Sequence, residues 1–183
     1  MSHFAVRRTI PAVSPGEAGQ FTPTPAADEP HLLASYWTPS NRQLLSIYEK
    51  APAVAGTEAE LLSVLPITAD EYGPPAMAPA AGDGRELGLV LVRRHLEPQT
   101  DRQFRAVALQ AITCAFEYTD LLWLRSYWAT EQNELLCLFR TRTHSLVREH
   151  AYRSRIPCDE IHDAVEIAPA SALRTATGVP VTN

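Results

Sequence analysis

The apolar positions in the second half of the chain predict a regular series of strands and helices. Residues 87–95 form an apolar run rich in leucine and valine, which is typical of a strand covered on both faces. A helix is predicted next, because Thr100 and Gln103 form a capping box and the apolar residues that follow recur with a helical period. The apolar stripe of this helix comprises Phe104, Val107, Ala108, Ala111, Ile112 and Ala115.

Two further apolar runs and a second helix complete this pattern. Residues 121–129 and 134–140 flank a polar segment, which predicts an antiparallel hairpin. A helix is expected after Thr143, and a last strand is expected over 164–168. The inner face of this helix comprises Leu146, Val147, His150 and Ala151. The predicted order of strand, helix, strand, strand, helix and strand is that of ferredoxin-like folds.

The first half of the chain repeats parts of the second half. Ser35-Tyr36-Trp37 recurs as Ser126-Tyr127-Trp128, and the same spacing relates Leu44-Leu45 to Leu135-Leu136. Such a recurrence indicates a domain duplication. Prolines between positions 11 and 30 exclude a first helix from this half, because proline removes a backbone donor and clashes with the preceding turn. A short second helix is predicted from Thr57 to Leu65.

The fold class predicted from these patterns is α+β, with two ferredoxin-like repeats in one chain. Residues 1–72 form a degenerate repeat without its first helix, 73–85 form a linker rich in proline and glycine, and 86–172 form the complete repeat. Residues 173–183 are expected to be a flexible tail. Because residues 135–139 are all apolar, we expect the two sheets to pack face to face as an intrachain pseudo-dimer, similar to a dimeric α/β barrel.

Composition and charge narrow the classes of partner. The 183-residue chain has a formal net charge of -5 and no clearly basic face, so a nucleic-acid partner is not expected. No apolar run approaches the roughly 18 residues that a membrane helix needs, and the expected location is cytoplasmic. The three cysteines lack a C-x-x-C spacing, which favours free thiols over disulfides or structural zinc.

A set of residues in the second half carries a resemblance to a known family. The set comprises Cys114, Ser126-Tyr127, Cys137, Phe139, the segment from Val147 to Ala151, Arg153, Pro157 and Ile161. Across residues 88–169 the chain resembles a bacterial ferredoxin-like domain family of unknown function, one member of which binds nickel. The resemblance implies a unit that dimerises and, in that member, holds nickel at its surface. It assigns no nickel ligand to a residue of this chain.

Two groups of side chains are candidates for metal binding. The first comprises Cys114, Cys137 and His150, and the second comprises Cys158, Glu160 and His162. Thiolate, imidazole and carboxylate groups bind divalent transition metals such as nickel. The first group converges only if the sheet face that carries Cys137 lies under the helices. Buried cysteine and histidine are also common in cores that bind nothing, so a structural role stays open.

Two functions follow from these features. The first is a small cytoplasmic protein that binds a small molecule or a metal ion, either nickel or another divalent transition metal. The second is an enzyme that acts on a small organic substrate, acidic or neutral, in a pocket between sheet and helices. Its candidate acid-base or anchoring groups are His150, His95, Arg94 and Cys137, because imidazole and thiol exchange protons and the arginine fork suits carboxylates. An interaction module without a ligand and a homodimer both stay open.

Overall fold

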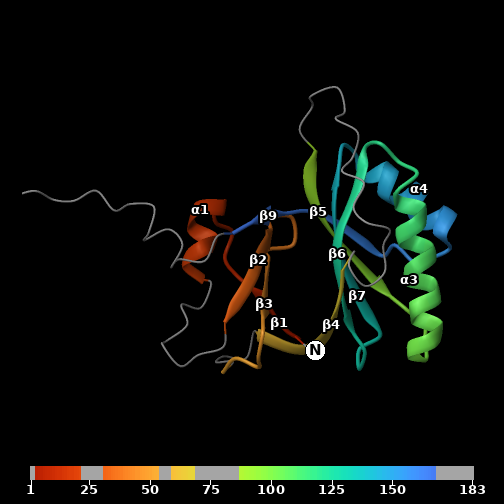
Figure 1. The fold of residues 1–183 in the computed structure, drawn as a ribbon. Helices are drawn as coiled ribbons and strands as arrows, with labels where there is room; N and C mark the ends of the chain where they lie inside the picture. The colour runs from red at the N-terminus through yellow and green to blue at the C-terminus, as the bar shows by residue number, and fades with distance from the viewer. Residues whose placement is uncertain (1–2, 22–30, 54–58, 69–86, 168–183) are drawn as a thin grey trace, which may run out of the picture. The chain divides into compact units, whose positions relative to one another are not determined.

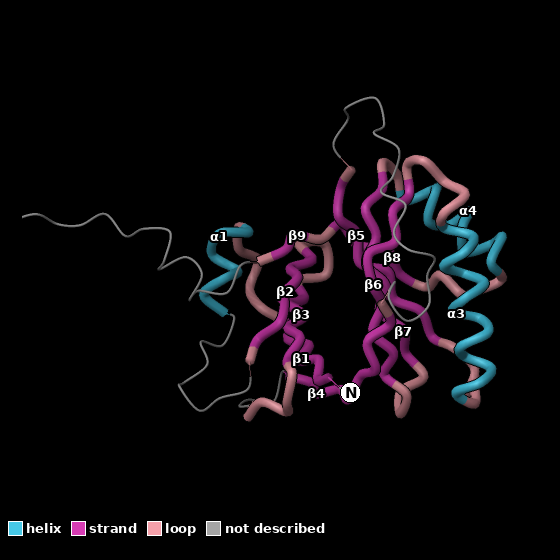
Figure 2. The backbone as a smooth tube through the Cα atoms, viewed as in Figure 1, coloured by secondary structure: helices cyan, strands magenta, loops and turns pink. Residues whose placement is uncertain are grey.

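The computed structural model describes residues 3–21, 31–53, 59–68 and 87–167. These residues fall into two compact units. Figure 1 labels their helices and strands and colours them by residue number. Unit 1 comprises Ser63–Ala164, and unit 2 comprises the described residues up to Leu62 together with those from Val165 onward. Strands make up most of the described residues in Figure 2.

Unit 1 contains an antiparallel sheet and the two long helices of the described chain. Its strands lie in the order β8-β5-β7-β6-β4, and α3 and α4 lie side by side against the sheet (Figure 1). The elements are β5 (Gly88–His95), α3 (Asp101–Ala115), β6 (Leu121–Ala129), β7 (Glu134–Thr141), α4 (His144–Ser154) and β8 (Glu160–Asp163). The last strand of this sheet is β4 (Ala59–Ile67), which pairs with β6 through Leu65, Pro66 and Ile67.

Local sequence signals explain the helices of unit 1. The predicted capping box is confirmed, because Thr100 Oγ1 accepts a hydrogen bond from the Gln103 amide and the Gln103 side chain accepts one from the Thr100 amide. The buried face of α3 contains Phe104, Ala108 and Ile112, as the stripe predicts. Helix α4 follows Thr143 as predicted and ends at Ser154; the next residue, Arg155, adopts a left-handed conformation with φ of 56°.

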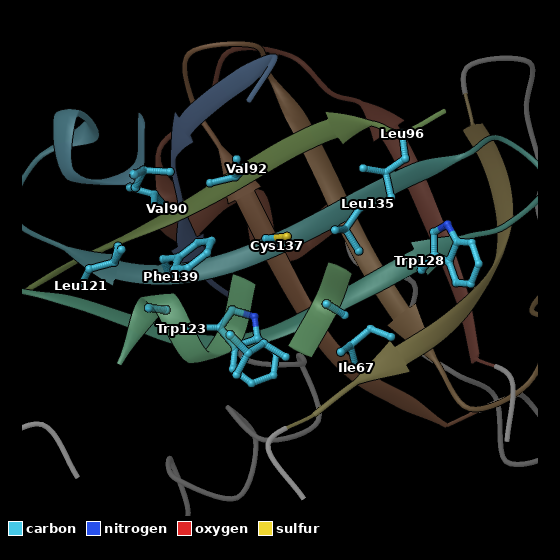
Figure 3. Close-up of a cluster of buried hydrophobic side chains, with 14 of the residues drawn as sticks. Ile67, Val90, Val92, Leu96, Leu121, Trp123, Trp128, Leu135, Cys137 and Phe139 are labelled. Carbon is cyan, nitrogen blue, oxygen red and sulfur yellow. The ribbon is translucent and has the colours of Figure 1, made fainter. Parts of the chain in front are cut away.

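The core of unit 1 lies between the sheet and α3. Leu135, Cys137 and Phe139 project to one side of β7, next to the tryptophans of β6 (Figure 3). Phe104 of α3 stacks on Trp128 with ring centroids 3.7 Å apart and an angle of 11° between the rings. Burial of one such aromatic side chain stabilises the fold by about 1.5–3 kcal/mol, so this pair fixes the helix on the sheet.

Unit 2 is also an antiparallel sheet, and its strands lie in the order β4-β1-β3-β2-β9. Only Ala59–Leu62 of β4 belong to this unit. The other elements are β1 (His3–Thr9), α1 (Pro15–Ala18), the 3₁₀ turn η1 (Gly19–Phe21), β2 (Leu32–Thr38), β3 (Gln43–Tyr48) and β9 (Val165–Glu166). Ala18 of the short helix α1 packs with Trp37 and Ile167 in a small core.

The prediction of two ferredoxin-like repeats is wrong. The described chain is mainly antiparallel sheet with nine strands, and the residues predicted as the second helix of the first half lie in β4. Leu62 and Val64 are buried while the side chains of Leu61 and Ser63 are exposed, which is the alternation of a strand. Pro66 also disfavours a helical backbone at Leu65, because the residue before a proline avoids the α region. Thr57 and Glu58 lie outside the described residues.

The tandem repeat and the pseudo-dimer of two ferredoxin-like units built on it are wrong as well. The recurring Ser-Tyr-Trp segments lie in two hairpins of the same register, because Tyr36 pairs with Leu45 and Tyr127 pairs with Leu136. The likeness is therefore local: similar hairpins need similar buried residues, whereas the helices that cover unit 1 have no counterpart of their length among the described residues of unit 2.

The remaining predictions concern the last strand, the linker between the halves and the C-terminal tail. The strand predicted over 164–168 is replaced by β8 and β9, with Ala164 between them. The predicted linker over 73–85 and the predicted tail over 173–183 lie outside the described residues. In the part of the chain that the structure describes, no helix is both long and apolar enough to cross a membrane.

Candidate ligand pocket

A cavity of about 30 Å³ lies in unit 1 between the sheet and the helices. Its walls are mostly apolar and include Phe104, Ile112, Trp123, Leu135, Phe139 and Ile156. Besides the indole of Trp123, four lining side chains carry polar or reactive atoms, namely Arg94, Ser126, Cys137 and His150. A water molecule needs roughly 10–15 Å³ of such space, so the cavity suits about two waters or a single carboxylate group.

Arg94 is the most unusual residue of this pocket. Its side chain is 0% exposed, and Nη1 donates a hydrogen bond to the carbonyl oxygen of Pro157. Nε and Nη2, which form one edge of the guanidinium, have no partner within the described residues. A buried guanidinium without a counter-charge costs several kcal/mol, so this edge is expected to receive an acceptor.

The guanidinium group of the neighbouring Arg93, by contrast, has carboxylate partners. Arg93 Nη2 donates to Glu134 Oε2 at 3.1 Å, and Arg93 Nη1 lies 3.5 Å from Glu160 Oε1. Adjacent residues of a strand point to opposite faces, so Arg93 lies on the face away from the pocket and Arg94 lies beneath the helices. The carboxylates of Glu134 and Glu160 therefore do not neutralise Arg94.

His150 of α4 borders the same cavity and is 1% exposed. Its Nε2 atom donates a hydrogen bond to the carbonyl oxygen of Ala111 at 2.8 Å, and Nδ1 has no partner within the described residues. Burial lowers the pKa of His150, and the positive charges of Arg94 and Arg153 lower it further. The imidazole is therefore neutral near pH 7 and offers the Nδ1 lone pair as an acceptor.

Cys137 and Ser126 lie opposite each other on β7 and β6. Cys137 is 4% exposed, and its side chain points toward the helices from the same side of the sheet as Leu135 and Phe139 (Figure 3). Ser126 Oγ accepts a hydrogen bond from Trp123 Nε1 at 3.0 Å. This pair adds weakly polar atoms to the wall without adding charge.

The remaining candidates lie elsewhere. His95 is half exposed, and its Nδ1 lies 3.2 Å from Asp159 Oδ2. Cys114 does not line the pocket, and burial raises the pKa of its thiol. Burial also raises the pKa of Cys158. Each of these groups is outside the set that the cavity brings together.

Glu160 and His162 interact with each other. His162 Nε2 lies 3.1 Å from Glu160 Oε2, and this hydrogen bond is the main reason that the pKa of Glu160 is lowered. Arg93 is a second partner of Glu160. The carboxylate is thus already occupied by two donors.

The donor sets expected for a metal do not form. Within the described ranges, no group of three or more histidine, cysteine, aspartate or glutamate side chains is arranged to hold a metal ion. The first predicted group contributes Cys137 and His150 to the pocket but not Cys114. Nickel binding, as the family resemblance implied it, therefore finds no support in these residues.

Sequence reasoning predicted that Cys137 and His150 converge if their sheet face lies under the helices, and it named Arg94 as an anchoring group, but it did not place Arg94 beside them. The missing signal was strand alternation: if residues 87–95 are covered on both faces, then one of Arg93 and Arg94 must lie under the helices. Sequence reasoning did not single out Ser126 as a pocket residue.

No family model, curated protein or solved structure matches this chain. The resemblance of the second half to a nickel-binding family stays a prediction, and the functional argument rests on the chemistry of the pocket.

Proposed function

We propose that the protein binds a small organic acid in the pocket of unit 1 and that Arg94 holds its carboxylate. One observation carries this proposal: Arg94 is fully buried, lines the cavity and has two neighbouring nitrogens without partners in the described chain. Nε and Nη2 are the pair of donors that a carboxylate bridges in a bidentate ion pair. An anion at this edge satisfies both donors and neutralises the buried charge.

The size and walls of the cavity support a short acid. A volume of about 30 Å³ fits a carboxylate and little else, so one or two further carbon atoms already press on the apolar walls. Those walls favour a short alkyl group over a second charge, because a buried second charge has no counter-ion there. Formate and acetate are therefore the best candidates.

A second candidate function is an enzyme that acts on the same acid. The neutral imidazole of His150 in the same cavity favours it, since an unprotonated Nδ1 can accept a proton from a bound substrate. Cys137 would be the second reactive group of that site.

The proposal places the protein in the cytoplasm, because its cysteines are free thiols.

The test is a calorimetric titration with formate, acetate, propionate and butyrate. Acetate has four non-hydrogen atoms, and a ceiling of about -1.5 kcal/mol per atom limits its dissociation constant to tens of micromolar or weaker, so titrations should extend to about 10 mM. Saturable binding is expected for the short acids, and Arg94→Met should abolish it. Arg140→Met is the matched control, because Arg140 is exposed on the same sheet.

Two outcomes would contradict the proposal. The first is that none of these acids binds to the wild-type protein up to that concentration. The second is that Arg94→Met binds them as well as Arg140→Met does, which would assign the binding to another surface.

A further inference from the structure

We propose that a second site, an open groove at the start of α4, binds a small organic ammonium ion on the carboxylate of Asp163. The groove has a volume of about 430 Å³, within the range of roughly 300–1,000 Å³ that is typical of small-molecule sites. It shares no lining residue with the cavity that contains Arg94 and His150. This inference is therefore independent of the proposed binding of an organic acid.

The groove is formed by strand ends of unit 1 and by the start of α4. Gly88 and Val90 lie on the same face of β5, because residues two apart in a strand share a face. Asp163, the last residue of β8, pairs with Val90, and His144 is the first residue of α4. Because Gly88 has no side chain, the space beside Val90 stays open.

Most polar side chains of the lining already have partners within the described chain. Thr141 Oγ1 donates to the carbonyl oxygen of Thr143 at 3.1 Å, and Thr143 Oγ1 lies 2.8 Å from Ser145 Oγ. Arg142 Nε lies 3.2 Å from Asp120 Oδ1, so the positive charge of this arginine has a counter-ion. A ligand therefore gains little from these groups.

Asp163 offers the groove an accessible charged acceptor. Its side chain is 83% exposed, and Oδ1 lies 2.9 Å from Nε2 of His144. A carboxylate only accepts hydrogen bonds, so Nε2 carries the proton of that bond. The second oxygen, Oδ2, has no hydrogen-bond partner among the described residues. His144 thus fixes one oxygen of the carboxylate and leaves the other for a ligand.

Charge selects a cation as that ligand. A hydrogen bond from a neutral histidine leaves the negative charge of Asp163 in place, and this charge repels an anion. An ammonium group carries three donors, so it can both neutralise the carboxylate and donate to Oδ2. The apolar surface at Val90 favours a short alkyl chain on the ammonium group.

The experiment compares butylammonium, 1-butanol and butyrate, which share a butyl or butanoyl chain and differ in the charge of the head group. Amide signals of the labelled full-length protein are followed by NMR at pH 7.5 and low salt. Butylammonium should shift the signals of Gly88, His144 and Asp163 saturably and bind about fivefold more tightly than 1-butanol, as expected of one exposed ion pair. Equal affinities of butylammonium and 1-butanol, or no saturable shift at these residues up to about 50 mM, would overturn the inference.

Two aspartates provide a matched pair of variants. Asp163→Asn keeps an oxygen for His144 but removes the charge, so it should abolish the preference for butylammonium over 1-butanol. Asp159→Asn removes the same charge from a similar pair outside the groove, since His95 Nδ1 lies 3.2 Å from Asp159 Oδ2. This control should keep the preference. An equal loss in both variants would show general attraction of cations to an acidic protein and would overturn the site.

Gly88→Val tests the location without touching a charged group. The nearest atom to a Cβ at residue 88 is the carbonyl oxygen of Thr141 at 3.6 Å, which is an ordinary contact, and valine suits a strand. The added side chain should fill part of the groove and weaken butylammonium binding by about tenfold. Unchanged binding would place the ligand elsewhere; if this variant fails to fold, the two aspartate variants decide.

Discussion

The Nε2 atom of His150 lies 2.8 Å from the carbonyl oxygen of Ala111, and this hydrogen bond joins α4 to α3. The bond links the two helices above the cavity, and it sets the protonation of the ring that borders the cavity. A single contact thus joins the two helices and fixes which nitrogen of the His150 ring carries the proton.

The stability of the protein should fall as the pH drops below about 6.5. The pKa of His150 is lowered in the folded state by burial, so the unfolded chain takes up a proton at a higher pH than the folded one. The neutral His150 contributes fully to stability above its pKa in the unfolded chain. This contribution is lost as the pH falls toward its pKa in the folded protein. The slope is at most about 1.4 kcal/mol per pH unit for one group.

Urea unfolding at pH 7.5, 6.5 and 5.5 measures this effect. The charged groups that act on His150 are Arg94 of β5 and Arg153 of α4, and arginine side chains keep their charge in proteins. His150→Gln serves as the control, because it differs from the wild type only at this residue. The same pH dependence in the variant and the wild type would show that His150 is not responsible.

Substitution of Arg94 and Arg93 by methionine should change stability in opposite directions. Arg94→Met removes a buried charge without a counter-ion and should raise the free energy of unfolding, within about 1–4 kcal/mol. Arg93→Met removes the arginine that pairs with Glu134, whose side chain is 2% exposed, and should lower the free energy of unfolding. Urea unfolding of both variants in acid-free buffer tests this, and destabilisation by Arg94→Met would contradict it.

Phe104→Ala should destabilise unit 1 strongly. Phe104 is buried and stacks on Trp128, so its removal leaves a void between α3 and the sheet and costs about 3–5 kcal/mol. Leu109→Ala is the control on the same helix. Leu109 is 51% exposed, so this substitution should change the free energy of unfolding by less than about 0.5 kcal/mol. Equal losses in thermal unfolding would show that the stacked pair does not fix the helix.

Thr100→Ala should weaken the start of α3. The substitution removes the acceptor for the Gln103 amide and should cost about 1 kcal/mol. Thr113→Ala, at an exposed position later in the helix, should cost nothing measurable. Hydrogen exchange at the first amides of α3 gives a local readout, and unchanged protection there in Thr100→Ala would exclude the capping role.

The sequence predicts the elements of unit 1 well because their signals are local. The capping box at Thr100 and the stripe that begins at Phe104 each define α3 within a few residues. The residues of β4 were ambiguous, because Leu61, Leu62 and Leu65 also suit a short helix, and only burial against other strands decides for the alternation of Leu62 and Val64.

The candidate site was predictable in part. The convergence of Cys137 and His150 follows from strand alternation and helix periodicity once the covered face of β7 is known. That Arg94 lacks a carboxylate partner could not be predicted from the sequence, because the sequence does not show which of two adjacent arginines faces the acidic residues. In the structure, Arg93 faces Glu134 and Glu160. A global duplication was inferred from hairpin residues that similar packing alone explains.

Strand β9 joins residues from distant parts of the chain, since Val165 pairs with Trp37 and Glu166 pairs with Tyr36. During translation, β2 is therefore made long before β9, its neighbour at the end of the sheet. Nearly all of unit 1 is synthesised between the two strands. An unpaired strand edge is open to wrong partners during this interval. The order of synthesis thus favours unit 1, with its pocket, as the part that can fold first, and leaves unit 2 dependent on residues translated after it.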